Sequence, residues 1–205
     1  MSQSISVNKR NGRGTEPLNI DKIHKMVGFA CEGLSGVSES QVEMNSDLQF
    51  YDGITTDEIQ QILIKSANDL ITLDNPNYQY VAARLLLFSL RKSLHHRLWK
   101  HPHFKEHIQK CIKLGVYDKE IIKWYNENEL DQMNGLIKHE RDYLFSYAGM
   151  RQVIDKYLVQ DRSNGAIYET PQFMYMMIAA TLFRNYPKER RMNYVKKYYN
   201  AISTH

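Results

Sequence analysis

Cationic side chains flank a tight turn near the amino terminus, and this combination can bind phosphate. Lys9 and Arg10 precede the turn Asn11-Gly12-Arg13-Gly14, and Lys22 follows it at the start of an expected helix. Lysine and arginine neutralise phosphate oxygens, and the backbone N–H groups of a turn or of a helix amino terminus point at an anion. Residues 7–22 therefore have the chemistry of a polyphosphate site.

A second cationic pair, Arg91 and Lys92, lies at the end of another expected helix and could close on the same phosphate. The common nucleotide motifs do not support this interpretation, because the sequence contains neither the P-loop pattern GxxxxGK[ST] nor the dinucleotide pattern GxGxxG. From spacing alone, an ordinary charged hairpin surface explains residues 7–22 better than a phosphate site does.

The stretch LHHRLWKHPHFKEH, residues 94–107, contains five histidines and could hold a metal, since neutral imidazole is a common Zn²⁺ ligand. It lacks the paired cysteines or the HExxH spacing that make a zinc site specific, and Pro102 interrupts the helix that would align the histidines. We therefore expect no metal in this chain. No nucleophile, base and orienting group can be assembled from the sequence, so we also expect no catalytic residues.

The composition is that of a folded, helix-rich protein with one medium domain or two small ones. The chain has 205 residues, 42% of them hydrophobic, with only 10 Gly and 5 Pro. Its net charge of +4 is far from that of a dedicated nucleic-acid-binding protein, and the basic tail RRMNYVKKYYN fits an amphipathic helix. We therefore do not expect nucleic acid as a partner.

The two cysteines and the apolar stretches indicate where the protein resides. Cys31 and Cys111 lie in expected helices, eighty residues apart, a pattern typical of reduced thiols in the cytosol. The amino terminus has no apolar signal-peptide core, and the longest apolar stretch, residues 173–183, is too short to cross a bilayer. We expect a cytoplasmic protein with no membrane partner.

A β-hairpin followed by four helices is predicted for residues 1–95. Asn11-Gly12 between two short strand-like runs is a strong hairpin signal, because both residues tolerate positive φ. Asn19 is expected to cap the first helix, and Thr55 with Glu58 fits a capping box before the third. The expected helices cover residues 20–30, 38–50, 56–70 and 76–92.

Residues 96–205 are predicted to form a second, helical unit that could include a short β-hairpin around residues 161–166. The helix that opens at Thr170-Pro171 is apolar on nearly every side, so either it lies at the centre of this unit or another chain covers it. The predicted fold class is mainly α, with a hairpin-capped four-helix domain followed by this unit. The other expected helices cover residues 108–114, 119–125, 129–137, 141–157 and 189–199.

Several long motifs in series resemble one enzyme family. VNKRNGRGTEPLNIDKIHK, YDGITTDEIQ and PNYQYVAARLLLFSLRK are similar to the ATP-cone domain at the amino terminus of the class I ribonucleoside-diphosphate reductase large (alpha) subunit. GVYDKEIIKWYNENELDQM, KHERDYLFSYAGMRQVIDKYLVQD, GAIYETPQF and YYNAIST resemble the helical segment that precedes the catalytic barrel of that subunit. The resemblance covers essentially the whole chain in order, and phage-encoded members look most similar.

This resemblance implies that residues 1–95 bind ATP or dATP as an allosteric effector of the reductase. Lys9, Arg10 and Lys92 would neutralise the phosphates, while Glu16 and Asn19 could form hydrogen bonds with the base or the sugar. The full set of implied nucleotide contacts is Val7, Lys9, Arg10, Glu16, Pro17, Leu18, Asn19, Ile20, Asp21, Lys22, Thr56 and Lys92.

The chain departs from the family pattern near the implied pocket. Cellular members often carry histidine where this sequence has Gln60 and Ser89. The departures leave open whether dATP inhibits, because nucleotide binding and its coupling to oligomeric state are separable.

The resemblance also limits what the chain does alone. Neither Cys31 nor Cys111 falls at a catalytic motif of the family, so the implied activity requires the rest of the large subunit, with its barrel, and the small radical-generating subunit. Residues 96–205 would be the helical segment before the barrel. An alternative is a free-standing ATP-cone module or regulator whose basic tail touches nucleic acid.

Overall fold

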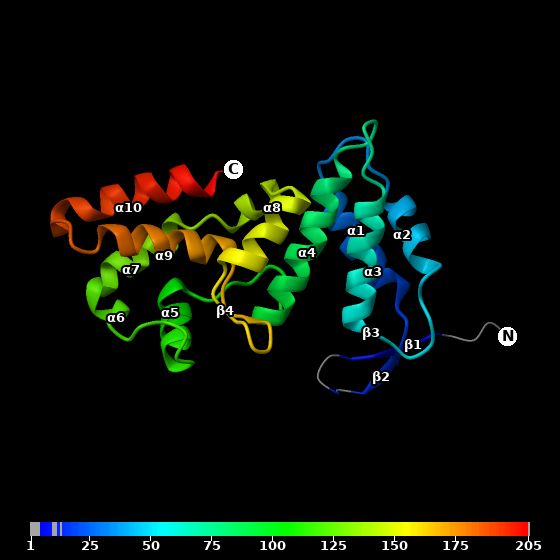
Figure 1. Cartoon of the computed structure of the whole chain (residues 1–205), viewed down its shortest axis with the longest axis horizontal. Coiled ribbons are helices and arrows are strands. Elements are labelled where there is room, and N and C mark those ends of the chain that lie inside the picture. The colour runs from blue at the N-terminus through cyan, green and yellow to red at the C-terminus, as the bar shows by residue number, and fades with distance from the viewer. Residues whose placement is uncertain (1–4, 10–11, 13, 205) are drawn as a thin grey trace. The chain divides into compact units, whose positions relative to one another are not determined.

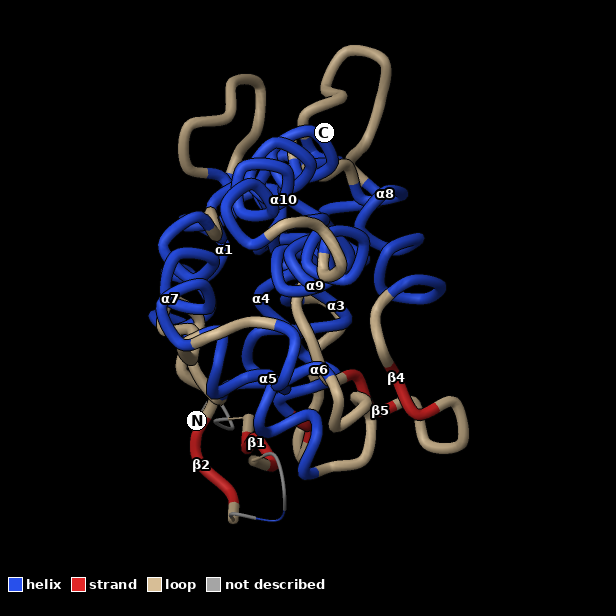
Figure 2. Tube along the Cα trace, turned by 90° about the vertical axis from the view of Figure 1, so that its left-hand side faces the viewer, coloured by secondary structure: helices blue, strands red, loops and turns tan. Residues whose placement is uncertain are grey.

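The structure, a computed structural model, describes residues 5–9, 12 and 14–204. These residues form two compact units, one of residues up to Ser89 together with Phe145–Arg151, the other of Leu90–Leu144 and the residues from Gln152 onward. The mainly α fold class is confirmed, because helices dominate the trace in Figure 2 and the strands of the described residues form two small sheets. None of the described helices combines the length and apolar character that a membrane span requires.

The predicted amino-terminal hairpin is confirmed and gains a third strand. Strands β1 (Ser6–Asn8) and β2 (Thr15–Pro17) pair antiparallel, and β3 (Ile54–Thr55) pairs parallel with β1, in the order β2-β1-β3. Of the turn that joins β1 to β2, residues 10, 11 and 13 lie outside the described residues. The sheet places Thr56, where the helix that follows β3 begins, beside the end of β1.

Four helices follow the hairpin as predicted, and the side-chain caps predicted for two of them are present. The Asn19 side chain caps the first helix by accepting the Lys22 N–H at 3.0 Å, and Thr55 and Glu58 form both bonds of a capping box on the third. Helix α2 packs on both α1 and α3 (Figure 1). The four helices are α1 (Ile20–Cys31), α2 (Glu39–Asp47), α3 (Thr56–Asp69) and α4 (Tyr78–His95).

The core of the first unit is built from apolar residues at helical spacing, among them the fully buried Val27, Leu63 and Leu85. Arg84 on α4 has backbone partners at the edge of this core. The Arg84 guanidinium donates to the carbonyl oxygens of Ala30 and Glu32, at 3.1 and 2.7 Å, and so satisfies the carboxyl end of α1.

The second unit contains short helices and one long helical pair. Helices α9 and α10 lie against each other, and β4 and β5 form the short antiparallel hairpin predicted around residues 161–166 (Figures 1 and 2). Its elements are α5 (Phe104–Lys113), α6 (Ile121–Trp124), α7 (Glu127–Leu136), a 3₁₀ helix (His139–Leu144), a π-helical turn (Val153–Tyr157), β4 (Gln160–Asp161), β5 (Ala166–Ile167), α9 (Pro171–Phe183) and α10 (Lys188–Ser203).

The single helix predicted over residues 141–157 is wrong. The chain there forms the 3₁₀ helix, then α8 (Tyr147–Gln152), then the π-helical turn. Ser146 starts α8 anew, because its hydroxyl accepts the Gly149 N–H at 3.2 Å. The side chain of Asp142 is held in the interior by partners distant in sequence. The spacing of apolar residues in this stretch predicts neither the new helix start at Ser146 nor the distant partners of Asp142.

Helix α9 buries most of its circumference inside its own unit. Phe173, Met176 and Ala179 are fully buried, and the helix packs along α10. On another side, Ile178 and Leu182 remain 39% and 52% exposed. Thus α9 is central to the second unit while one strip of it stays open to solvent.

Candidate functional site

The end of β1 is the point where several of the predicted nucleotide contacts meet. Because β3 runs parallel to β1 and leads directly into α3, the start of α3 lies beside the end of β1. The Thr56 hydroxyl donates to the Asn8 carbonyl oxygen at 3.2 Å. Thr56 and Lys9, 47 positions apart in the sequence, therefore lie on adjoining segments.

The antiparallel partner strand contributes Glu16. Val7 is directly opposite Glu16, and the Lys9 N–H donates to the Gly14 carbonyl at 2.9 Å, so the pairing continues past the strand. Side chains that are opposite each other, or two residues apart, share one face of a sheet. Val7, Lys9 and Glu16 are accordingly on the same face of the hairpin.

Helix α1 brings Lys22 to this face. The Glu16 carboxylate lies 2.9 Å from Lys9 Nζ through Oε2 and 3.1 Å from Lys22 Nζ through Oε1. The two lysines hold the pKa of Glu16 below its usual value, with the hydrogen bond from Lys9 as the larger cause. The structure thus joins three of the predicted contact residues in one charged cluster.

The remaining residues between β2 and α1 have positioning contacts. Pro17 pairs with Ser6, and the Leu18 N–H donates to the Ile5 carbonyl at 2.8 Å. Asn19 caps α1, and the next two residues, Ile20 and Asp21, form its exposed first turn. Backbone pairing and a helix cap therefore fix the segment from which Lys22 extends.

A loop that the sequence analysis did not assign to the site ties β1 in place. The Asp52 carboxylate accepts both the N–H and the hydroxyl of Ser6, at 2.8 and 2.7 Å, and Asn8 Nδ2 donates to the Gly53 carbonyl at 2.7 Å. Gly53 adopts φ +82°, which favours glycine. The Asp-Gly pair in YDGITTDEIQ is the sequence signal that could have identified this turn.

Three predicted cationic contacts have different outcomes. Arg10 lies outside the described residues. Lys92 lies on α4 within the second compact unit, and its contact with nucleotide stays a prediction. Arg91, which could have closed on the same phosphate, is 2% exposed and donates through Nη2 to His139 O at 2.7 Å and to Asp142 Oδ2 at 3.2 Å, so its guanidinium is held by protein partners.

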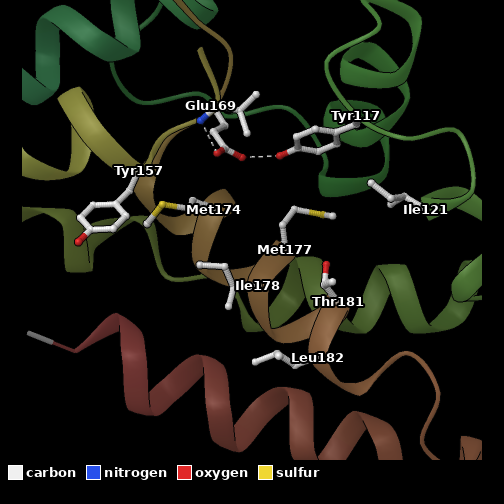
Figure 3. A pocket seen from close by; sticks show the side chains of 10 residues that line it. Tyr117, Ile121, Tyr157, Glu169, Met174, Met177, Ile178, Thr181 and Leu182 are labelled. Atoms are coloured by element: carbon white, nitrogen blue, oxygen red, sulfur yellow. Dashed lines mark hydrogen bonds between the residues drawn. The ribbon is translucent and has the colours of Figure 1, made fainter.

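The second unit has an apolar groove of about 350 Å³ that differs in character from the charged cluster (Figure 3). Among its lining residues, Glu169 accepts a hydrogen bond from the Tyr117 hydroxyl and another from the Val159 N–H, the latter at 2.8 Å. Burial raises the pKa of Glu169. The lining residues are Tyr117, Ile121, Tyr157, Val159, Glu169, Met174, Met177, Ile178, Thr181 and Leu182, and they include no cation for phosphate.

Two histidines of the histidine-rich stretch, His95 and His101, form a half-buried cluster with His139. His101 stacks on His139 with ring centroids 3.6 Å apart, and the His95 ring lies edge-on to His101 at 5.6 Å. In the part of the chain that the structure describes, no three His, Cys, Asp or Glu side chains are arranged to hold a metal ion.

Comparisons with known proteins match two segments of the chain to protein families. The family described as "ATP cone domain" matches residues 5–93, and the family described as "Ribonucleotide reductase, all-alpha domain" matches residues 143–205. The chain carries an ATP cone and a ribonucleotide reductase all-alpha domain. The charged cluster of Lys9, Glu16 and Lys22 lies within the ATP cone.

Relatives match the chain throughout and confirm the predicted resemblance. The ribonucleoside-diphosphate reductase 1 alpha subunits of Salmonella typhimurium and Escherichia coli are 50% and 49% identical over 204 residues, which is 100% of this chain and 26% of each relative. The alpha subunit of Enterobacteria phage T4 is 41% identical over 202 residues, 98% of this chain and 26% of that protein. The expectation that phage-encoded members are most similar is therefore wrong, since the two bacterial subunits have the higher identity. The chain thus spans about a quarter of the length of these relatives.

Proposed function

We propose that the ATP cone binds ATP or dATP as an allosteric effector and that the chain acts as the amino-terminal portion of a ribonucleoside-diphosphate reductase large subunit. The observation that carries the proposal is the convergence of Lys9, Lys22 and Thr56 around the end of β1. Two ammonium groups beside a helix start are suited to a polyphosphate.

The roles of the contact residues follow from their chemistry. Lys9, Arg10, Lys22 and Lys92 neutralise phosphate, and the Thr56 hydroxyl adds a hydrogen bond. The polar side chains of Glu16 and Asn19 suit the base or the sugar. Val7, Pro17, Leu18, Ile20 and Asp21 complete the proposed contacts through backbone groups and side-chain packing.

Reduction itself is proposed to take place in the rest of the large subunit, with its barrel, together with the small radical-generating subunit. A reductase needs cysteines that react, and reactive cysteines are partly exposed with a low thiol pKa. Cys31 and Cys111 are buried, and burial raises the pKa of each thiol to about 11. These properties support a regulatory role for this portion. We also propose that the protein is cytoplasmic and that the boundary between the ATP cone and the helical segment lies near residue 95.

Gln60, one of the two departures from the family pattern, lies in the core of the first unit. Gln60 is 2% exposed, and its Nε2 donates to the Leu85 carbonyl on α4 at 3.0 Å. The side chain thus joins α3 to α4. We propose that both ATP and dATP bind and that the inhibitory response to dATP is weakened.

Calorimetric titration with ATP tests the nucleotide site. Replacing Lys9 and Lys92 together by alanine removes two charge-assisted contacts and should weaken ATP binding by about a hundredfold. Lys196→Ala, in α10, is the control and should leave affinity unchanged. Equal affinity of the wild type and the double variant would show that the nucleotide site is elsewhere.

A reconstitution assay separates the two classes of function. The chain is mixed with a barrel fragment and the small subunit, and nucleoside-diphosphate reduction is measured. Restored turnover that responds to ATP supports the proposal. If no complex forms and the chain instead retains DNA at moderate salt, the free-standing regulator becomes the better explanation.

A further inference from the structure

Glu16 binds the same two ammonium groups that the proposed function assigns to phosphate. Each of its oxygens has its own lysine, Oε2 with Lys9 and Oε1 with Lys22. The carboxylate is ionised at neutral pH, as an ordinary glutamate is, and both lysines lower its pKa further. Glu16 is therefore an anion already seated between the cations of the cluster.

A phosphate group cannot use both lysines without approaching this carboxylate. A phosphate oxygen within about 3 Å of both ammonium nitrogens would lie next to the Glu16 oxygens, where like charges repel. The ammonium groups have other N–H donors, but the repulsion between the two anions remains. Binding of phosphate therefore favours a rotation of the Glu16 side chain away from the lysines.

The backbone around Glu16 is fixed, so only its side chain can move when phosphate replaces its carboxylate at the two lysines. Glu16 is the middle residue of β2, in register with Val7, and the chain enters α1 through the Asn19 cap. These contacts fix the backbone on both sides of it. The Glu16 side chain itself is 35% exposed, so rotation toward solvent requires no change in the fold.

We propose that Glu16 is an intramolecular competitor of the polyphosphate, which lowers nucleotide affinity by holding Lys9 and Lys22. This inference rests on the proposed function, since it concerns the same site. It differs from the role of Glu16 as a partner of the base or the sugar, because only competition predicts that removing the Glu16 charge strengthens the binding of a ligand that has neither base nor sugar.

Inorganic tripolyphosphate, which has neither base nor sugar, is the probe that separates the two roles. Glu16→Gln keeps the size of the side chain and removes its charge, so tripolyphosphate affinity measured by calorimetry should rise about three- to tenfold, as for the loss of exposed ion pairs. Glu32→Gln, one residue beyond the far end of α1, makes the same change in net charge and should have little effect.

The outcomes distinguish this inference from the proposed function. Equal or weaker tripolyphosphate binding by Glu16→Gln, in a variant whose circular dichroism matches the wild type, overturns the competition. A gain that also appears in Glu32→Gln overturns it too, because net charge alone would then explain the effect. If tripolyphosphate binding rises as expected while the wild type fails to bind ATP, the competition stands and the proposed function fails.

A second measurement tests whether the competition depends on Lys9 and Lys22. In a chain that carries Lys9→Ala and Lys22→Ala, Glu16 has no ammonium group of the cluster to hold. Glu16→Gln in that background should change tripolyphosphate affinity less than twofold. An undiminished gain there would overturn the competition, since Glu16 would then act without the two lysines.

Discussion

Arg91 and Asp142 form an ion pair in the interior of the second unit. Arg91 Nη2 lies 3.2 Å from Asp142 Oδ2, and the two side chains are 2% and 0% exposed. Gln172 Nε2 donates to the other Asp142 oxygen at 2.9 Å, and Tyr199 donates its hydroxyl to Gln172 Oε1 at 2.6 Å. The network joins α4, the 3₁₀ helix, α9 and α10 through polar contacts.

Removing one partner of this ion pair should destabilise the second unit strongly. Arg91→Met leaves the Asp142 carboxylate buried without its cation, which typically costs about 3–5 kcal/mol of unfolding free energy. Urea denaturation followed by circular dichroism measures the loss. Lys123→Ala, which breaks the exposed pair with Glu120, is the control and should have a much smaller effect. A loss below about 1 kcal/mol in Arg91→Met would contradict a structural role for the pair.

The half-buried cluster of His95, His101 and His139 should make the second unit sensitive to acid. Burial lowers the pKa of His95 to about 4, of His101 to about 3 and of His139 to about 2. The folded state therefore favours the neutral rings, and stability is full above the unfolded value of about 6.5 and is lost as pH falls below it.

Neighbouring charges decide the size of this effect. The nearby cations Arg91 and Lys110 disfavour a further positive charge on the cluster, as does His107 beside His139. Asp142 acts in the opposite direction, because burial raises its pKa to about 6, so protonating it between pH 6 and 4 favours the folded state. Glu169 acts in the same direction as Asp142, because burial raises its pKa too. The three histidines, together with His107, whose pKa burial lowers to about 3, outweigh these two carboxyl groups.

The measurement is the urea midpoint at pH 7 and pH 5. We expect a clear decrease at pH 5 in the wild type and a smaller decrease in His101→Gln, which removes one titrating ring from the stack. A midpoint that does not change between the two pH values would contradict burial of these rings as neutral groups.

The exposed strip of α9 should bind apolar probes. Ile178 and Leu182 line the apolar groove and are 39% and 52% exposed, so the 205-residue chain should enhance the fluorescence of a hydrophobic dye or self-associate. Replacing both by glutamine should reduce the dye signal by about half or more. Leu73→Gln, a fully exposed position in the first unit, is the control. A monomer that does not bind the dye would contradict the prediction that the exposed apolar residues of the groove bind apolar partners.

Two adjacent threonines should separate folding from nucleotide binding. Thr55 accepts the Glu58 N–H at 3.1 Å as the cap of α3, so Thr55→Ala should cost about 1 kcal/mol of stability and leave ATP affinity nearly unchanged. Thr56→Ala should instead weaken ATP binding several-fold with little loss of stability. Thermal unfolding and calorimetry on the two variants check both statements, and equal effects of the two substitutions on ATP would contradict the assignment of Thr56.

Local chemistry made much of the fold predictable. The Asn19 cap and the capping box of Thr55 and Glu58 act within a few residues, so sequence alone locates the starts of α1 and α3. The pairing of β1 with β2 was also predicted, although Asn11 of the expected turn lies outside the described residues. β3 was not predicted, because a strand of two residues has no periodicity and depends on a parallel partner far away in the sequence.

Predictions that depended on distant partners were less successful. Arg91 has the chemistry of a phosphate ligand, but its partner Asp142 is 51 residues away and invisible to spacing. The same limit applies to the site. Lys9, Glu16 and Lys22 could each be singled out, whereas the sharing of one carboxylate by two lysines follows from the strand register and the start of α1.

The buried thiols give the molecule a practical property. Cys31 and Cys111 are buried, and their raised pKa keeps both thiols protonated at neutral pH. A cysteine introduced at an exposed position would therefore be the preferred target of a maleimide. Fluorophores could then be attached at one chosen point in each unit without first removing the natural cysteines. Energy transfer between them would report, in real time, whether effector binding changes the separation of the two units.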